Sequence, residues 1–335
     1  MKTNPARRQL LKLSLGATAI ALTPQAIEFA KAAEDFIKGP PMKDIRPEKL
    51  GPHVWMIYSP DGFPTAENLG MMANITFVVT QKGVVILDSG ASVQIGEMAI
   101  RMIKTITSKP VIAIFNSHYH GDHFLGNQAF VEAYGNIPIY AHPYTIEQIK
   151  GIEGNAWRNL MERWTNQATA GTKVIPPTHA VKHGDLFNYG DVRIKIHHYG
   201  VAHTPGDICM QVIEDRITHV GDIAMENRIA NIDDGSYVGT FKTYAALSKA
   251  TGEQLWVPGH GHATKTLLKD YGEFLAGIYE SCVQAVKDGQ DPSAAKALVL
   301  KDPRVARRAK TMAGFESNIG KYTSLAYLEA EKEAF

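Results

Sequence analysis

The sequence lacks the features that mark several protein classes. Its 335 residues include 35 basic and 34 acidic side chains, so the formal net charge is only +1. This balance excludes the strong basic field of a nucleic-acid-binding or anionic-membrane-binding protein. Low-complexity runs and short-period repeats are also absent. With 44% hydrophobic residues, the chain is long enough to bury a large core, as two domains or as one large layered domain.

Cysteine is scarce as well. Only Cys209 and Cys282 occur, the first in an apolar run and the second in a helical pattern. A bridge between them is possible in an oxidising compartment. We expect instead two buried free thiols, because both lie in segments that should belong to the core.

The N-terminal segment has the composition of a targeting signal. It has a basic start, an apolar run from Leu10 to Leu22 that is short for a membrane span, and a small-residue cleavage pattern at 30–32. Arg7 and Arg8 resemble the twin-arginine export motif, although an ordinary secretory signal is the alternative. We therefore predict a twin-arginine signal peptide over residues 1–32 and a mature domain over 33–335. The twin-arginine export machinery would then deliver the protein to the bacterial periplasm without a stable membrane anchor.

The mature chain alternates strand and helix patterns. Short β-branched or aromatic runs predict strands, and apolar residues at helical spacing predict a helix between them. In the first half the strands are expected at 53–59, 74–80, 83–90 and 109–118, and the helix at 92–106. Further strands are expected within 190–200, 206–215 and 216–222, with helices at 241–250 and from 263 onward. The class is α/β, with strands in two blocks that each have helices alongside.

The middle of the chain differs from this pattern. Residues 150–180 contain a short amphipathic helix with Trp157 and Trp164, followed by a polar stretch. This segment is either an inserted lid or a helix packed on the body of the protein with its tryptophans buried.

A dense group of metal-binding side chains follows the strand at 109–118. The stretch NSHYHGDHFLGN contains His118, His120, Asp122 and His123. In a loop after a strand, the first three lie at alternate positions and can point to one side. Imidazoles and a carboxylate suit zinc and neighbouring first-row ions. The spacing alone is compatible with one metal or with two.

Three later residues have a similar setting. His203, Asp222 and His260 each follow an apolar stretch and lie next to or near a glycine. Glycine allows the backbone to approach an ion closely. Each of the three is weak evidence when taken alone.

Together the seven residues resemble the five-motif signature of the metallo-β-lactamase-fold hydrolases. The resemblance extends over nearly all of the mature chain and implies an αββα sandwich, here with C-terminal helices. It also implies two Zn²⁺ ions or related first-row metals: one held by His118, His120 and His203, the other by Asp122, His123 and His260, with Asp222 bridging them. A hydroxide shared by the metals would be the nucleophile, and Asp122 would orient it or pass a proton to the leaving group.

Departures from the family pattern bear on the substrate. Asp222 stands where β-lactamases of the thiolate subclass have cysteine, and this difference argues against antibiotic hydrolysis. An aspartate at this place is typical of glyoxalase II-like thioesterases and of lactonases. Residues 221–247 are similar to exported zinc hydrolases associated with quinoprotein oxidation and with sulfur oxidation. We therefore expect a small-molecule ester, thioester or lactone-like substrate.

Two residues near the site have open roles. Arg228 either holds an anionic substrate group or pairs with Asp233 or Asp234, and Tyr119 either faces the cleft or packs beneath the metal-binding loop. Three alternatives to the zinc hydrolase remain: a mononuclear-iron, persulfide dioxygenase-like oxidoreductase, a β-lactamase-like hydrolase, and a non-catalytic periplasmic metal-binding accessory protein.

Overall fold

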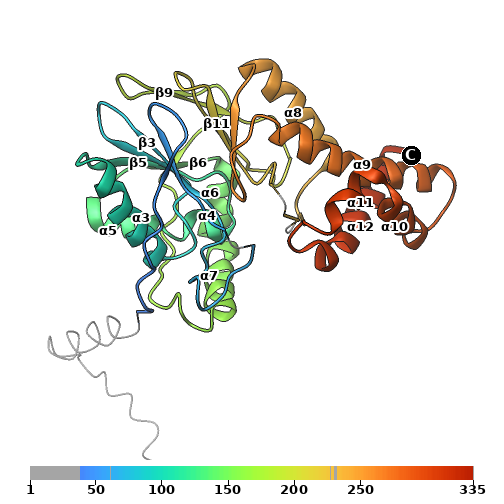
Figure 1. Ribbon diagram of the computed structural model, residues 1–335, viewed down its shortest axis with the longest axis horizontal. Coiled ribbons are helices and arrows are strands. Elements are labelled where there is room, and N and C mark those ends of the chain that lie inside the picture. The colour runs from blue at the N-terminus through green and yellow to red at the C-terminus, as the bar shows by residue number, and fades with distance from the viewer. Residues whose placement is uncertain (1–37, 61, 227, 230–231, 335) are drawn as a thin grey trace, which may run out of the picture. The chain divides into compact units, whose positions relative to one another are not determined.

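The computed structural model describes residues 38–334 apart from 61, 227, 230 and 231 (Figure 1). The predicted signal peptide, residues 1–32, lies outside the described residues. Contacts group the chain from Gly39 onward into one unit. None of the helices in the described part is long and apolar enough to cross a membrane.

The first sheet comes from the N-terminal half and has its strands in sequence order, from β1 to β7. The pairs β1–β2, β2–β3 and β3–β4 are antiparallel, and the pairs β4–β5, β5–β6 and β6–β7 are parallel. The strands are β1 (Glu48–Lys49), β2 (Val54–Ile57), β3 (Ile75–Val79), β4 (Val84–Leu87), β5 (Val111–Phe115), β6 (Ile139–Ala141) and β7 (His179–Ala180).

The second sheet comes from the C-terminal half, in the order β12-β11-β10-β9-β8. Only the β11–β12 pair is parallel. The strands are β8 (Leu186–Asn188), β9 (Arg193–His197), β10 (Cys209–Val212), β11 (Ile217–Gly221) and β12 (Leu255–Pro258).

The two sheets pack face to face through one apolar core. Val85 and Ala113 of the first sheet share this core with Ile194, Met210 and Val257 of the second. Successive side chains of a strand point to opposite faces. Val84 and Ile86, which flank Val85, therefore belong to a different core on the outer face of the first sheet. Burial on both faces explains why the strand reads as an uninterrupted apolar run.

Helices cover both outer faces and complete an αββα sandwich (Figure 1). Helices α3 (Val93–Ile106) and α5 (Asn127–Tyr134) cover the first sheet, whereas α8 (Tyr237–Thr251) and the start of α9 (Leu267–Lys287) cover the second. Helix α3 begins where the Ser92 side chain accepts a hydrogen bond from the Ile95 N–H, which is a favoured way to satisfy a helix N-terminus. The fold class is thus the one predicted from the sequence.

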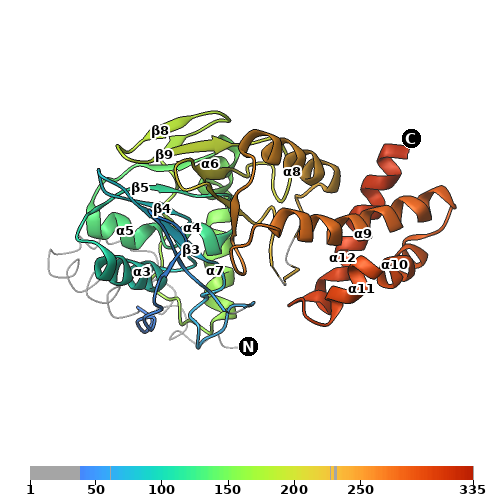
Figure 2. The same ribbon diagram turned by 45° about the horizontal axis from the view of Figure 1, so that its top comes forward.

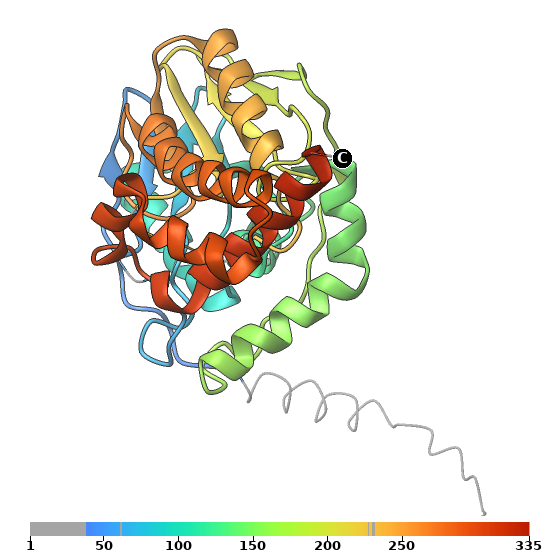
Figure 3. The same ribbon diagram turned by 90° about the vertical axis from the view of Figure 1, so that its right-hand side faces the viewer.

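Helices α9, α10 (Pro292–Lys301), α11 (Pro303–Ala309) and α12 (Phe315–Ala334) form a C-terminal group (Figures 2 and 3). Helix α12 is joined to the start of α8 by Glu329, which accepts hydrogen bonds from the Ser236 hydroxyl and the Tyr237 N–H at 2.5 and 2.7 Å. These contacts fix α12 beside the segment that connects β11 to α8.

Most predicted elements are confirmed, and the differences are in the short ones. The strand expected at 109–118 ends at Phe115, and the helix of the middle segment is α7 (Ile152–Trp164). The sequence analysis missed β1, β6, β7 and β8, the short helix α4 (Gly121–Phe124), α5, and α6 (Pro143–Lys150), because such short segments hold too few residues for a periodic pattern. Cys209 and Cys282 are buried free thiols, as expected.

Candidate metal centre

The loop after β5 is held by buried polar side chains. The Asn116 side-chain amide donates to the His123 carbonyl at 3.1 Å, and the Ser89 N–H donates to the same carbonyl at 2.8 Å. The Asn127 amide donates in turn to the Asn116 side-chain oxygen at 2.9 Å. This network fixes the backbone from which the metal-binding side chains project.

The structure brings the seven predicted ligands together in two adjoining groups. In each group the donor atoms all lie within 4.8 Å of one another and all residues are buried. The first group is His118, His120, His203 and Asp222, and the second is Asp122, His123 and His260. These sets match the two metal positions implied by the family resemblance.

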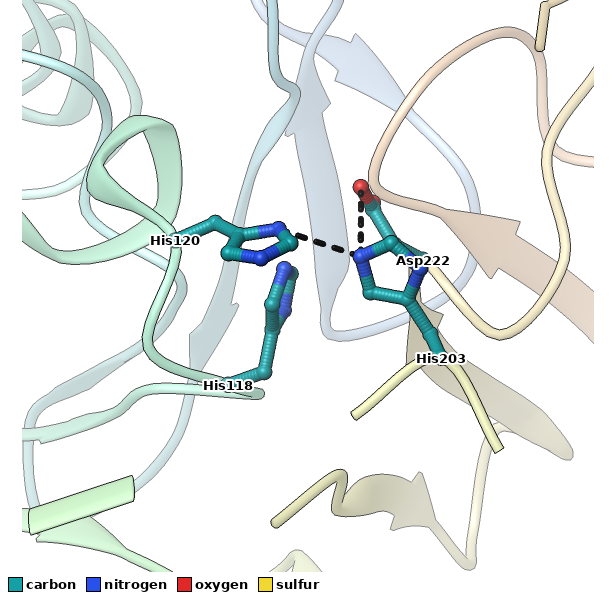
Figure 4. Close-up of side chains that lie close together, drawn as sticks. All are labelled: His118, His120, His203 and Asp222. Carbon is teal, nitrogen blue, oxygen red and sulfur yellow. Dashed lines mark hydrogen bonds and ion pairs between the residues drawn. The ribbon is translucent and has the colours of Figure 1, made fainter. Parts of the chain in front are cut away.

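Asp222 lies between the two groups. In the first, His203 Nε2 is 3.1 Å from His120 Nδ1 and 3.8 Å from Asp222 Oδ2 (Figure 4). In the second, His260 Nε2 is 3.1 Å from the same Asp222 oxygen and 3.2 Å from Asp122 Oδ2. The Asp222 carboxylate is therefore within reach of both candidate metal positions, as a bridging ligand must be.

Several buried donor atoms of this cluster lack a hydrogen-bond partner. Within the described part of the chain, His118 Nε2, His123 Nε2 and Asp222 Oδ1 are buried and form no hydrogen bond, although the last two lie 3.4 Å apart. Leaving such an atom unsatisfied costs about 1–3 kcal/mol. Two metal ions, one in each group, would satisfy all of them, so the residues present fit divalent cations.

The other ring nitrogens have partners that orient the imidazoles. His118 Nδ1 lies 3.0 Å from the Ser117 hydroxyl, His123 Nδ1 2.8 Å from Asp88 Oδ2, and His260 Nδ1 2.5 Å from the Met72 carbonyl. In each ring this leaves Nε2 directed into the cluster. Such outer partners fix the orientation of metal-binding histidines.

Burial and charge give most of these groups the protonation state that metals require. Against the effect of burial, however, the neighbouring carboxylates raise the pKa of His123 and His260, which must lose their protons when a metal binds. Burial, reinforced by His203, lowers the pKa of His120 to about 3, and burial lowers the pKa of His203 to about 4. Burial alone would raise the pKa of Asp122, but His123 and His260 together hold that pKa well below its usual value. Neutral imidazoles and ionised carboxylates are the forms that bind metals.

Asp88 is a residue of the candidate site that the sequence analysis missed. It follows β4, is fully buried, and accepts hydrogen bonds from His123 Nδ1 at 2.8 Å and His219 Nε2 at 2.9 Å. Its other oxygen accepts the Ser117 N–H at 2.7 Å. The available signal was its position, because Asp88 follows a buried strand and precedes Ser-Gly, much as Asp222 follows β11.

Two glycines allow the backbone to approach the cluster. A Cβ on Gly259 would lie 2.1 Å from Asp222 Oδ1, and a Cβ on Gly221 would lie 2.7 Å from the Ser117 hydroxyl. Gly221 also has a φ of 55°, a conformation that favours glycine. The glycines noted in the sequence are therefore needed where the strands end at the centre.

A cleft with a volume of about 510 Å³ opens above the centre. The metal-centre residues His120, Asp122, Asp222 and His260 form part of its wall. Apolar and polar residues from several elements line the rest: Phe63, Pro64, Met72, Trp157, Leu160, Trp164, Arg228, Asp233, Asn318 and Lys321. Helix α7 is thus a wall of this cleft, with Trp164 44% exposed, and is not fully buried against the body.

Tyr119 does not line this main cleft. Its ring is buried, and its hydroxyl donates a hydrogen bond to Asp234. It lines an adjoining pocket together with Glu153. Tyr119 therefore links the metal-binding loop to the segment that precedes α8.

The fold consists of two sheets enclosed by helices, and histidines and aspartates cluster where loops from both halves meet. This is the architecture of a class of metal-dependent hydrolases. A family model described as Metallo-beta-lactamase superfamily matches residues 69–274. The chain belongs to the metallo-beta-lactamase superfamily. Helices α10 to α12 lie beyond the matched residues.

Solved metallo-beta-lactamases have a similar fold. The enzyme from Pontibacter korlensis superposes with a TM-score of 0.54 at 19% identity, covering 67% of this chain and 95% of that one. The enzyme from Hirschia baltica gives 0.53 at 20% identity, covering 69% and 97%. The enzyme from Erythrobacter litoralis gives 0.51 at 19% identity, covering 68% and 95%. At these identities the likeness shows the fold alone. A comparison with curated protein sequences gave no significant match.

Proposed function

We propose that this protein is an exported hydrolase that holds two zinc ions and cleaves a small ester, thioester or lactone-like substrate. One observation carries the proposal: seven buried donors form two adjoining groups that share Asp222 on the wall of a substrate-sized cleft. Other first-row metals are compatible with the same imidazole and carboxylate donors.

The residues divide into three roles. His118, His120 and His203 would hold one ion, Asp122, His123 and His260 the other, and Asp222 would contact both. Two such ions, when bound, lower the pKa of water and polarise a carbonyl oxygen. The protein itself supplies fixed ligand directions, through Ser117, Asp88 and the Met72 carbonyl, and a cleft partly lined by apolar side chains.

Asp122 is the proposed catalytic residue. Its Oδ2 lies 3.2 Å from His260 Nε2, and the residue lines the cleft. From this place its carboxylate would orient the attacking water, accept its proton, and donate a proton to the leaving group.

The complete second group of ligands argues against the single-iron alternative, which would use fewer of these residues. Asp222, in place of a cysteine, argues against β-lactam hydrolysis. Metal analysis after purification without added chelator discriminates further: about two zinc ions per chain support the proposal, and a single iron contradicts it.

Turnover distinguishes an enzyme from a metal-binding accessory protein. Hydrolysis of a panel of thioesters, lactones, phosphate esters and β-lactams should be compared for the wild type, Asp122→Ala and the exposed control Asp288→Asn. We expect loss of at least about 100-fold in kcat/KM for the first variant and none for the second. If the metal-loaded wild type hydrolyses no member of the panel, the catalytic proposal fails.

The export proposal rests on the twin-arginine pattern and needs a test in cells. Cell fractionation should find the full chain in the periplasm, and replacing both Arg7 and Arg8 by lysine should retain it in the cytoplasm. Periplasmic accumulation of the double variant contradicts this route.

A further inference from the structure

The imidazole of His120 is not oriented by a hydrogen bond on its outer side. Its Nδ1 points into the cluster and lies 3.1 Å from His203 Nε2 (Figure 4). Its other ring nitrogen, Nε2, forms no hydrogen bond with the residues that the structure describes. His118, His123 and His260, in contrast, are each held through the nitrogen that faces away from the cluster. The torsion that turns a histidine ring is broad and roughly two-fold, so the His120 ring needs another constraint to keep Nδ1 directed at a metal.

Two aromatic side chains supply such a constraint. The ring centre of Trp157 lies 4.7 Å from that of His120, with 43° between the ring planes. The ring centre of Tyr119 lies 4.9 Å from that of His120, with 81° between the planes. Aromatic rings attract one another in edge-to-face and offset arrangements at centre distances of about 4.5–7 Å. The His120 ring is therefore held by packing, with one neighbour from its own loop and one from α7.

Helix α7 packs closely against the metal-binding loop at Trp157. A Cβ on Gly121, the residue after His120, would lie only 2.8 Å from the Trp157 Cβ, so the two segments are as close as glycine allows. Trp157 packs against the apolar core on the outer face of the first sheet, and Met161, one turn further along α7, is buried in that core. Residues four apart on a helix lie on the same face. The anchored face of α7 therefore presents the indole to His120.

The second tryptophan of α7 has a different place. The ring centre of Trp164 lies 6.3 Å from that of Trp157, and the Trp164 side chain is one of the exposed large apolar groups. Among the described residues, its one ring contact is with Trp157, and it has no ring contact with a proposed metal ligand. The two tryptophans are thus a matched pair on one helix, of which only Trp157 contacts a ligand.

We propose that Trp157 is a positioning residue of the metal centre. Its indole holds the His120 ring so that Nδ1 stays directed into the first group of ligands, a task that hydrogen bonds perform for His118, His123 and His260. Helix α7 would then support metal binding in addition to forming a wall of the cleft. This inference rests on the proposed two-metal function and identifies the part of the chain that orients one ligand of the first group.

The test is zinc affinity of the full chain, measured by competition with a chromogenic chelator. Trp157→Ala should weaken one of the two bound zinc ions by about three- to ten-fold, the factor that one aromatic pair contributes, and should leave the other ion nearly unchanged. Trp157→Phe should recover most of the loss, because it keeps a flat ring against His120. Trp164→Ala is the matched control and should leave both zinc affinities unchanged.

A spectroscopic readout separates positioning from general destabilisation. In the cobalt-substituted protein, the visible absorption of the bound ions reports the arrangement of their ligands. Trp157→Ala should change this spectrum, Trp157→Phe should restore it, and Trp164→Ala should leave it as in the wild type. The melting temperature of each variant is measured without metal. Trp157→Leu replaces Trp157→Ala if the latter does not fold, because leucine keeps apolar volume but not the flat ring.

Unchanged zinc affinities and an unchanged cobalt spectrum in the folded Trp157 variant would overturn the proposal, even if that variant melts at a lower temperature. An equal loss of affinity in Trp164→Ala would also overturn it, because the effect would then belong to the helix and not to the ring that contacts His120. A wild type that binds no zinc would overturn the two-metal proposal together with this one. The failure of this inference alone is therefore distinguishable, since the wild type would still bind two ions.

Discussion

Gly259→Ala is the most informative single perturbation of the proposed metal centre. Gly259 directly follows β12 and its φ is not in the left-handed range, so the backbone itself accepts alanine. The new Cβ would nevertheless lie 2.1 Å from Asp222 Oδ1 and 2.6 Å from His123 Cε1. The substitution therefore acts on two proposed ligands without changing either of them.

The magnitude follows from these distances. Contacts of a Cβ below 3.0 Å are essentially never observed, so the Asp222 oxygen or the backbone must move by roughly 1 Å. Metal–ligand distances tolerate deviations of only about 0.2 Å. Misplacement of a catalytic group by about 1 Å costs on the order of 100-fold in rate. We expect a loss of that size in kcat/KM and the release of at least one of the two metals.

The assay is metal content by elemental analysis together with zinc affinity by competition with a chromogenic chelator. Gly320→Ala in α12 is the matched control, because its Cβ would meet only the Lys296 ammonium at 3.6 Å. Alanine within a helix should raise the free energy of unfolding by about 0.5–1 kcal/mol and leave metal content unchanged. Two metals bound by Gly259→Ala with wild-type affinity would refute the assignment of Asp222 as the shared ligand.

Three further predictions concern the support of the site and of the fold. Asp88→Asn should weaken metal binding by about 10- to 100-fold, because it disturbs the hydrogen bond to His123; unchanged chelator competition would contradict this. Zinc at 100 times its dissociation constant should raise the free energy of unfolding by about 2.7 kcal/mol. Urea denaturation with and without chelator measures this difference, and an equal denaturation midpoint in both would contradict metal binding to the native state. Tyr237→Phe should lower the free energy of unfolding by about 1 kcal/mol, because the buried Tyr237 hydroxyl donates to the Tyr322 carbonyl at 2.9 Å; an unchanged denaturation midpoint would argue against that bond.

Local patterns predicted much of the architecture. Buried strands such as β4 appear as uninterrupted apolar runs because both faces are covered, by the second sheet and by α3. Helix α3 repeats its apolar residues at helical spacing over 14 residues, long enough for a clear signal. The segment between Gly121 and Lys150 was missed for the opposite reason, since its helices α4, α5 and α6 are only 4 to 8 residues long.

The sequence by itself determined the dense motif of His118, His120, Asp122 and His123, because four ligating side chains within six positions lie close together in almost any loop. Only the tertiary structure decided that His203, Asp222 and His260 join them. Residues so distant along the chain meet only through the pairing of strands and the packing of two sheets, which depend on contacts that no local pattern contains. Arg228 shows the same limit: the sequence placed it near Asp233 and Asp234, but Lys321 of α12 and Tyr119 of the metal-binding loop occupy those carboxylates. Because these two distant elements contact Asp233 and Asp234, the Arg228 guanidinium remains available to the cleft.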